Sequence, residues 1–562
     1  MDIQTAHLTQ KDFIKTICNS LQVRDPLWCF PEQNLEIRIS EINERSLHFA
    51  CALEKIDVKS GDFIGISLGN NLDFITALFA SFHLGVVAVP LKPLNGNQKE
   101  NCAYIDKIQK KSSLKTIVYD SETEPESLSF WKKSTGEKAY NFNELHSINV
   151  LGTNRLQSEI CGSKIALIQY SSGSTGTPKG VIITWDMVIK QVCYLHSVYQ
   201  LHNGYSAIPS MSSWLPFYHD MGLFMGIIYP LYFNADNFLA SPRYFLSRPV
   251  RWFQHISDRM IDVSFTTNSA MSFSLRKLEM LPEGTLNLSR VHLFFGAEKI
   301  SPFILRRTIK ILGLHGLRSD RVFAGYGMAE NALGATSTIN SAPKIVHAEI
   351  DISGNVSIKE CSTENSIELV SCGLPYNGVS ITIRDENDKC LDELKIGEIS
   401  IQGPCVTPGY INDPENSSNV IPMPGRLLTR DLGFIYNNEV YFYARKDDMI
   451  IIGGRNVIPD DIEMAVEEFD YVKSGTSVLI GVENKIDNNT DLHLLVESRN
   501  LVDTKILNEQ RIMLRKSIID SFGILINNIH FCNKNTVEKT SSGKKRRKIV
   551  KELFMKNEIE IF

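Results

Sequence analysis

Hydrophobic and polar residues follow two different periods in the first part of the chain. Apolar residues recur at helical spacing over 40–54, and DFIGISL (62–68) is then a short apolar run typical of a strand. A second helical run, LDFITALFASFHLG (72–85), ends at a glycine before the strand-like VVAVPL (86–91). Strand, helix and strand in this order predict a β-α-β unit, which favours a parallel sheet covered by helices.

The middle of the chain repeats this alternation. KIALIQY (164–170) predicts another strand, and it runs into a loop of serine, threonine and glycine. Ligands bind at such strand ends in sheets of this kind, so this loop is the first candidate site. Between about 365 and 445 the pattern changes to short alternating strands separated by Gly, Pro, Asn and Asp, which predicts a small β subdomain.

Beyond residue 445 a further unit is expected. IPDDIEMAVEEF and the stretch 505–521 have helical periodicity, whereas TSVLIGV and LHLLVES are strand-like. We therefore predict an α/β fold in two domains. Residues 1–445 form a large N-terminal domain of packed α/β subdomains with a small β subdomain, and residues 446–562 form a small, mobile α+β C-terminal domain. A chain of 562 residues has ample length for both.

Composition narrows the class of protein. The chain is 43% hydrophobic and 22% charged with a net charge of −5, which is typical of a soluble globular protein and predicts no nucleic-acid partner. Eleven scattered cysteines without a C-x-x-C pair fit free thiols in the cytoplasm. The start of the chain lacks the basic and apolar stretches of a secretory signal. The most apolar stretch, 221–233, is interrupted by Gly and Pro and is shorter than the about 20 residues that span a bilayer. We expect a buried core segment there, and no stable membrane insertion.

The strongest chemical signal is YSSGSTGTPKG, residues 170–180. Its glycines allow the backbone to approach a polyphosphate closely, its hydroxyls donate hydrogen bonds, and Lys179 adds a positive charge. The spacing of its glycines and the proline before Lys179 do not fit the GxxxxGK[ST] loop of P-loop NTPases. An ordinary surface loop is the alternative, and it is disfavoured because so many hydroxyls and glycines follow a buried type of strand.

This loop and the motifs after it resemble the adenylate-forming superfamily of acyl-CoA synthetases, luciferases and peptide-synthetase adenylation domains. SWLPFYHDMGL (213–223), FFGAEKI (294–300) and YGMAENALGAT (326–336) resemble fatty acyl-AMP ligases most closely. The resemblance covers nearly the whole chain. It implies ATP and Mg²⁺ as cofactors, a carboxylic acid, expected to be a fatty acid, as substrate, and an acyl carrier protein as partner. It places ATP on these loop residues: Ser171, Ser172, Gly173, Ser174, Thr175, Gly176 and Lys179.

The resemblance also predicts which residues contact the adenine and the metal ion. Tyr326 is expected to stack on adenine, and Glu330 is expected to act in catalysis by holding Mg²⁺, which prefers carboxylate and phosphate oxygens. Without the motif, a core tyrosine and a surface charge would be the simpler interpretations. The other expected ATP contacts are Ala297, Glu298, Gly327, Met328 and Ala329.

Three further positions match the family near the predicted domain junction. Asp431, in LLTRDLG, is expected to accept hydrogen bonds from the ribose hydroxyls, although Arg430 stands where the family usually has glycine. Arg445, in ARKDD, is expected to contact ribose or phosphate, with Ala444 in place of a usual glycine. Asp447 resembles the hinge residue, about which the C-terminal domain would turn.

EKTSSGKKRRK resembles the terminal catalytic loop, and the match puts the catalytic lysine at Lys544. Its ammonium would neutralise charge at the α-phosphate during attack by the carboxylate. A basic surface run or a nucleic-acid patch over 544–548 is the alternative. His219 is assigned to the catalytic, acyl-binding side, with Asp220 as its structural neighbour, although a lone histidine is more often structural. The expected acyl pocket consists of Trp214, Met225 and Asn268.

Three alternatives stay open. Residues 344–368 read like the extra segment of acyl-AMP ligases, which favours a carrier protein over free coenzyme A as the acceptor. An acyl-CoA synthetase and an amino- or aryl-acid adenylating enzyme remain possible, because the pocket is not readable from one sequence. A nucleotide-binding scaffold without catalysis is disfavoured because Glu330, Asp431, Arg445 and Lys544 are all present.

Overall fold

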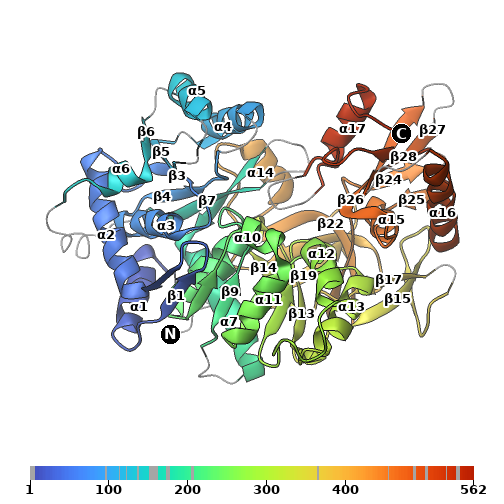
Figure 1. Ribbon diagram of the computed structural model, residues 1–562, viewed down its shortest axis with the longest axis horizontal. Coiled ribbons are helices and arrows are strands. Elements are labelled where there is room, and N and C mark those ends of the chain that lie inside the picture. The colour runs from blue at the N-terminus through green and yellow to red at the C-terminus, as the bar shows by residue number, and fades with distance from the viewer. Residues whose placement is uncertain are drawn as a thin grey trace.

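The computed structural model of the chain is drawn in Figure 1. It describes residues 7–94, 98–112, 114–121, 123, 125–135, 138–150, 163–171, 178–203, 208–363, 366–452, 455–484, 489–499, 504–526, 528–539 and 545–562. Two large sheets are built from strands between residues 27 and 375, and the elements after residue 446, orange and red in Figure 1, lie together at the upper right of the view.

The first large sheet grows from the predicted β-α-β unit. β3 and β4 pair in parallel, with Phe63 opposite Val87, and α3 connects them, which confirms the prediction. The side chain of Asn71 caps the start of α3, and Gly85 ends the helix with a φ of 72°, a left-handed conformation that favours glycine. The strands of this sheet, in spatial order, are β6 Lys138–Asn141, β5 Thr116–Tyr119, β3 Phe63–Ser67, β4 Val87–Pro90, β7 Ile165–Ser171 and β8 Lys179–Thr184.

The second large sheet is parallel in its centre and antiparallel at both edges. Its strands, in spatial order, are β18 Leu374–Pro375, β14 Gly334–Ser337, β13 Val322–Gly327, β12 His292–Phe295, β11 Val263–Thr266, β9 Met211–Ser213, β10 Asn237–Leu239, β1 Leu27–Phe30 and β2 Leu35–Arg38. One hydrophobic core joins this sheet to the first. The apolar stretch 221–233 lies buried in that core, as predicted.

Helices cover these sheets. In chain order they are α1 Gln10–Leu21, α2 Ile39–Lys55, α3 Leu72–Leu84, α4 Gln98–Ser112, α5 Pro125–Thr135, α6 Phe142–His146, α7 Trp185–Asn203, α8 Asp220–Leu223, the π-helix η2 Phe224–Ile228, α9 Tyr229–Tyr232, α10 Pro242–Ser247, α11 Pro249–Asp258, α12 Asn268–Leu278, α13 Pro302–Gly313, the 3-10 helices η3 Ser319–Arg321 and η4 Ala329–Asn331, and α14 Pro414–Val420. None of the helices in the described part of the chain is both long and apolar enough to cross a bilayer.

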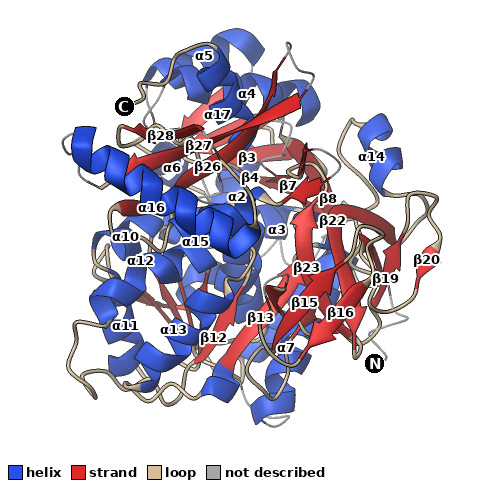
Figure 2. Ribbon diagram, turned by 90° about the vertical axis from the view of Figure 1, so that its right-hand side faces the viewer, coloured by secondary structure: helices blue, strands red, loops and turns tan. Residues whose placement is uncertain are grey.

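Two antiparallel sheets lie on the side turned to the viewer in Figure 2. The five-stranded sheet contains β20 Cys390–Leu391, β19 Ser380–Arg384, β21 Gly397–Gln402, β22 Arg426–Tyr436 and β23 Glu439–Arg445, in spatial order. A three-stranded sheet, β16 Val356–Lys359, β15 Ile345–Ile350 and β17 Ile367–Val370, is built by the extra segment. Its apolar side packs on Phe434 and Tyr441, so it rests on the strands that lead to the predicted domain junction.

We call residues 446–562 the tail. It contains β24 Ile450–Ile452, β25 Arg455–Val457, α15 Pro459–Val466, β26 Val472–Asn484, β27 Asn489–Ser498, α16 Thr504–Phe522, β28 Asn528–Cys532 and α17 Arg547–Met555. The described buried residues of the tail form hydrophobic clusters of their own, between Val457 and Val550. The mixed α/β architecture agrees with the predicted class, and the domain boundary at residue 445 stays a prediction.

Candidate functional site

The hydroxyl-rich loop is held between two antiparallel strands. Ser171, the last residue of β7, pairs with Lys179, the first residue of β8. Gly180 leaves no room for a side chain, because a Cβ there would lie 2.6 Å from the side chain of Ile411. The predicted ATP contacts Ser172, Gly173, Ser174, Thr175 and Gly176 lie outside the described residues.

Tyr410 connects the base of this loop to Glu330. The ammonium of Lys179 lies over the ring of Tyr410, 5.1 Å from its centroid, a cation–π arrangement. The phenol of Tyr410 donates a hydrogen bond to Oε1 of Glu330 over 2.8 Å. Burial and the neighbouring carboxylate raise the pKa of Tyr410, so its proton stays in place to donate. The predicted phosphate loop and the predicted metal ligand are therefore neighbours.

Backbone hydrogen bonds fix this arrangement. The amide of Thr407 donates to the carbonyl oxygen of Glu330 over 2.8 Å, and its hydroxyl donates to the carbonyl of Ile182 in β8 over 2.7 Å. The segment 406–411 thus joins η4 to β8. Gly327, just before η4, tolerates no side chain, since a Cβ would lie 1.9 Å from the carbonyl oxygen of Leu333. Met328 and Ala329 follow it and set the position of Glu330.

Tyr326, Asp431 and Arg445 form a second cluster. The hydroxyl of Tyr326 donates to Oδ2 of Asp431 over 2.8 Å, and Nε of Arg445 lies 3.6 Å from Oδ1 of the same carboxylate. Both Tyr326 and Asp431 are buried. Burial, with the carboxylate of Asp431, raises the pKa of Tyr326 well above its ordinary value, so the phenol is a stable donor. The three side chains come from β13, β22 and β23 and form one polar corner.

Arg430 has the backbone conformation that glycine would favour. Its φ is 61°, in the left-handed region. The guanidinium forms a two-point contact with Asp447, the predicted hinge residue, with Nε 3.0 Å from Oδ2. The amide of Arg430 also donates to Glu398 over 2.9 Å. The departure from glycine therefore keeps the backbone shape and adds an ion pair at the predicted hinge.

The loop after β12 carries Ala297 and Glu298. Ala297 also has a left-handed φ, of 69°, and the carboxylate of Glu298 accepts a hydrogen bond from the amide of Ser269 over 2.8 Å. This contact fixes the loop against the start of α12. Met221 lies beside Gly296, where an added Cβ would be 3.4 Å from its methyl group. The 219–221 segment and the 296–298 loop are therefore adjacent.

The residues predicted for the acyl side come from different elements of the fold. His219 precedes α8, and the neighbouring Tyr218 carbonyl accepts a hydrogen bond from buried Gln169 in β7 over 2.5 Å, which ties this segment to the strand of the phosphate loop. Trp214 is buried and stacks on Phe245 with centroids 4.0 Å apart. Met225 is buried in η2.

Asn268 has a different environment. Its side-chain oxygen accepts from the amide of Ser301 over 2.9 Å. It also lines a small cavity of about 40 Å³ together with tail residues such as Met464 and Glu467, and neither Trp214 nor Met225 lines this cavity. The predicted acyl pocket of Trp214, Met225 and Asn268 stays a prediction.

The predicted catalytic lysine, Lys544, lies outside the described residues. The next residue, Lys545, is anchored in the tail: its ammonium lies 2.9 Å from Oε2 of Glu463 and 2.8 Å from Oε1 of Glu467. Burial alone would lower the pKa of Lys545, but these two carboxylates raise it above its ordinary value. Arg547 pairs with the same Glu463 and, over 2.8 Å, with Asp460. The end of the predicted catalytic loop is thus fixed to α15.

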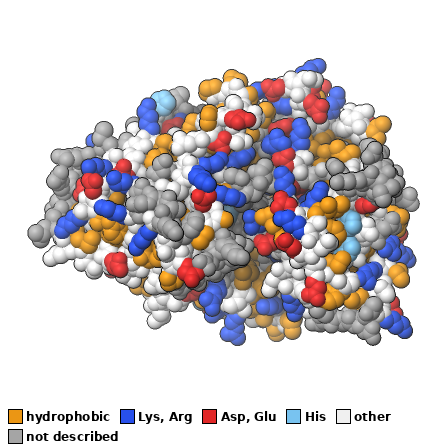
Figure 3. Space-filling model, turned by 90° about the horizontal axis from the view of Figure 1, so that it is seen from above, with side chains coloured by type: hydrophobic (Ala, Val, Ile, Leu, Met, Phe, Trp, Pro, Cys, Tyr) orange, Lys and Arg blue, Asp and Glu red, His pale blue; other side chains and the backbone are white. Residues whose placement is uncertain are grey.

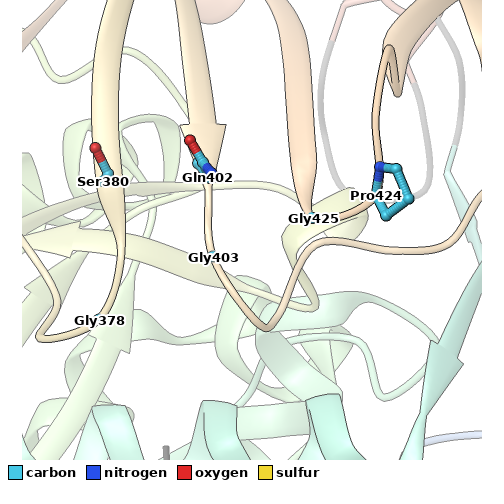
Figure 4. Close-up of a pocket in the computed structure, with 6 residues that line it drawn as sticks. All are labelled: Gly378, Ser380, Gln402, Gly403, Pro424 and Gly425. Atoms are coloured by element: carbon cyan, nitrogen blue, oxygen red, sulfur yellow. The ribbon is translucent and has the colours of Figure 1, made fainter.

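An open hollow lies away from these clusters, at the turn end of the five-stranded sheet (Figure 4). Its volume is about 460 Å³, and its lining residues are Gly378, Ser380, Gln402, Gly403, Pro424 and Gly425. Ser380 and Gln402 are register partners at the end of β21 opposite to Glu398, which contacts Arg430. The chemistry-bearing side chains are not among its lining residues. The molecular face drawn in Figure 3 carries basic and acidic side chains next to each other, without a single large positive area.

Sequence reasoning missed Tyr410, Gln169, Lys299 and Lys545. Tyr410 follows a Pro-Gly pair, which indicates a turn but not a partner 80 residues away. Gln169 lies inside an apolar strand, where a polar residue signals a buried hydrogen bond. This was the one signal that the sequence offered.

Comparisons with known proteins agree with this geometry. Residues 37–411 match the family model described as AMP-binding enzyme. The chain is 28% identical over 551 residues to the medium-chain-fatty-acid–[acyl-carrier-protein] ligase JamA of Moorena producens, covering 92% of this chain and 90% of that protein. It is 28% identical over 544 residues to the long-chain-fatty-acid–AMP ligase FadD23 of Mycobacterium tuberculosis, covering 92% and 91%. A solved structure from a study of fatty acyl-adenylate ligases of E. coli and L. pneumophila matches with a TM-score of 0.85 and 24% identity, over 98% of this chain and 99% of that one, which establishes the fold.

Proposed function

The chain belongs to the AMP-binding enzyme family, and from this premise we propose that it activates a fatty acid with ATP. The products of the first step are an acyl-adenylate and pyrophosphate. In a second step the acyl group passes to the phosphopantetheine thiol of an acyl carrier protein. The observation that carries the proposal is the contact chain from Lys179 through Tyr410 to Glu330, which unites the phosphate loop with a carboxylate.

The donor set at Glu330 suits Mg²⁺. Its oxygen Oε1 accepts from Tyr410, and among the described residues no hydrogen bond reaches Oε2. A partly exposed carboxylate beside a phosphate loop is the usual protein contribution to a Mg²⁺ site, in which substrate phosphates supply further ligands. When bound, Mg²⁺ would neutralise charge on the phosphates. Lys179 and the loop would hold the same phosphates in line for attack by the fatty carboxylate.

The polar corner supports binding of the nucleoside. Asp431 is a carboxylate with two acceptor oxygens and can receive both ribose hydroxyls. Tyr326 and Arg445 orient it by their contacts with Oδ2 and Oδ1. The adenine would stack on the ring of Tyr326, which is buried in this structure, and Ala297 and Glu298 would contribute from the adjacent loop. His219 is proposed to guide the carboxylate of the acid, because its segment adjoins both this loop and β7.

Tyr326→Phe tests this corner. The change keeps the ring but removes the hydrogen bond to Asp431, and a bond to a charged group contributes about 1.5–3 kcal/mol. We expect the KM for ATP to rise about tenfold, with a smaller change in kcat, because the lost bond orients a binding group. Steady-state pyrophosphate release at varied ATP measures it. Tyr471→Phe, which removes a phenol hydrogen bond to the carbonyl of Gln510 inside the tail, is the matched control. An unchanged KM in Tyr326→Phe would count against the role of Asp431.

The tail supports a two-step cycle. We propose that Lys544 enters the site for adenylate formation and leaves it when the tail turns about Asp447. Lys545 and Arg547 would carry Lys544 with α15 as one body, because their ion pairs attach the loop to that helix. The extra segment rests on β22 and β23, next to the turning point, and this favours a restrained tail and a carrier-protein acceptor.

An assay with alternative acids and acceptors tests the function. Purified protein, ATP and a mixed acid pool are analysed by mass spectrometry, and we expect fatty acyl-AMP as the adenylate formed. With a phosphopantetheinylated carrier protein, acyl transfer should be at least about tenfold faster than with free coenzyme A. Equal transfer to coenzyme A would indicate an acyl-CoA synthetase instead, and an amino- or aryl-adenylate would indicate a different acid class. Absence of any adenylate would indicate a nucleotide-binding scaffold.

A further inference from the structure

One buried ammonium connects three parts of the molecule. Lys299 lies in the loop between β12 and α13, directly after Glu298. Its Nζ donates to the carbonyl oxygen of Tyr443 over 2.9 Å and to Oδ1 of Asp461 over 2.5 Å. Tyr443 belongs to β23, the last strand before the tail, and Asp461 lies in the first turn of α15. We call residues 1–445 the body of the protein. Lys299 therefore holds the first helix of the tail to the body.

Burial distinguishes this ion pair from the other polar contacts across the junction. The side chains of Lys299 and Asp461 are 9% and 18% exposed. By contrast, Arg276 lies 3.5 Å from Asp470, whose side chain is 98% exposed. Water and salt screen an exposed pair and leave it nearly without effect, whereas separating a shielded pair leaves two poorly solvated charges. The Lys299–Asp461 pair should therefore contribute more to the orientation of the tail.

No shared hydrophobic cluster of the described residues fixes that orientation. Among the described residues, the core of the body and the clusters of the tail share no member. Besides the pairs Arg276–Asp470 and Arg430–Asp447, the neighbouring interface contains a hydroxyl contact, Ser272 to Ser474 at 2.8 Å, and the cavity of about 40 Å³ lined by Asn268 and Met464. An interface that contains a void and few shielded contacts can separate at low cost, so a shielded ion pair has a large influence on how firmly the tail is held.

We propose that Lys299 is a positioning residue that locks the tail in the orientation of this structure and releases Asp461 when the tail turns between the two half-reactions. The inference rests on the proposed function, because the lock would act on the turn of the tail between adenylate formation and acyl transfer. Burial raises the pKa of Asp461 even beside Lys299, which agrees with a carboxylate that tolerates this site only while the ammonium is near. No covalent change is involved.

Lys299→Met keeps the length of the side chain and removes its charge. We expect the ratio of the single-turnover rate of acyl transfer to that of adenylate formation to change about fivefold or more, since a coupling of one or two kcal/mol shifts an equilibrium by such factors. Arg276→Met breaks the exposed pair and should leave the ratio within about twofold of the original protein. A purely structural role of Lys299 would lower both rates together and leave their ratio unchanged, and that result would overturn the proposal.

Two further measurements guard against a folding defect. The charge-swapped protein with Lys299→Asp and Asp461→Lys should bring the ratio back to within about twofold, because the attraction is restored in reverse. Hydrogen exchange of the amides in the first turn of α15 and in 470–476 should be faster in Lys299→Met and not in Arg276→Met. Hydrogen exchange needs no enzymatic activity, so it tests the lock separately from the proposed reaction. Unchanged exchange in Lys299→Met would overturn the lock. An original protein that makes no adenylate would overturn the proposed function.

Discussion

Replacing Glu330 by glutamine is expected to lower the rate of acyl-AMP formation about 10²–10³-fold, the usual effect of removing one electrostatic group at a site of developing charge. The substitution preserves the shape of the side chain and an acceptor oxygen for Tyr410, so the hydrogen bond at 2.8 Å and the fold should persist. What is lost is the negative charge that would hold Mg²⁺ beside the phosphate loop. Pyrophosphate release at varied Mg²⁺ measures the effect, and higher Mg²⁺ should restore part of the rate.

Two control variants make this test specific. Glu360→Gln changes an exposed carboxylate in the extra segment and should leave the rate unaltered. Tyr410→Phe leaves Glu330 charged but removes its hydrogen bond, and the rate should fall between the other two. If Glu330→Gln retained both the original rate and the original Mg²⁺ dependence, the carboxylate would have no role in metal binding.

Replacing Lys545 by methionine is expected to destabilise the tail by about 3 kcal/mol, because it removes one cation from a buried ion cluster and leaves Glu467 with backbone hydrogen bonds from Gly475 and Ser477 but without this ion pair. The side chain of Glu463 is fully buried and keeps Arg547, but Glu467 loses its ion-pair partner at 2.8 Å. For a unit of this size the melting temperature of the tail should fall by roughly 10 °C or more. Thermal unfolding followed by hydrogen exchange within α15 locates the loss.

The two neighbouring lysines give a matched comparison. Lys548→Met removes an exposed charge in α17, three residues after Lys545, and should change stability by no more than about 0.5 kcal/mol. Lys544→Ala should remove adenylate formation with little change in melting temperature, since its proposed partner is the nucleotide. A loss of stability in Lys544→Ala equal to that in Lys545→Met would show that both lysines serve the fold.

Much of the fold was predictable because it depends on local pattern. The spacing of apolar residues over 62–91 predicts β3, α3 and β4, and it predicts that the two strands pair in parallel. The predicted helix at 505–521 corresponds to α16. The order of the nine-stranded sheet was not predictable. It places β1, at Leu27–Phe30, beside β10, at Asn237–Leu239, and such a pairing is decided by packing between distant segments.

The site shows the same division. The resemblance named Tyr326 and Asp431, and the structure brings them together across 105 positions of the chain. It could not assign a role to Tyr410 or to Lys299, although Lys299 lies within the motif FFGAEKI, because their partners Glu330 and Asp461 are distant in the sequence. The sequence shows that Arg430 replaces the glycine usual in the family, but it does not show what the arginine contacts. Its φ of 61° and its contact with Asp447 give the physical account.

The separate apolar clusters of the tail have an evolutionary consequence. A genetic crossover near residue 446 would fall between the hydrophobic clusters of the body and those of the tail and would cut none of them in the described chain. Chimeras that combine this body with the tail of a homologous ligase should therefore keep these clusters intact, and they need compatible charges at the interface positions, such as Lys299. Exchange of tails between lineages would then cost little stability, and such enzymes could acquire new acceptors in this way.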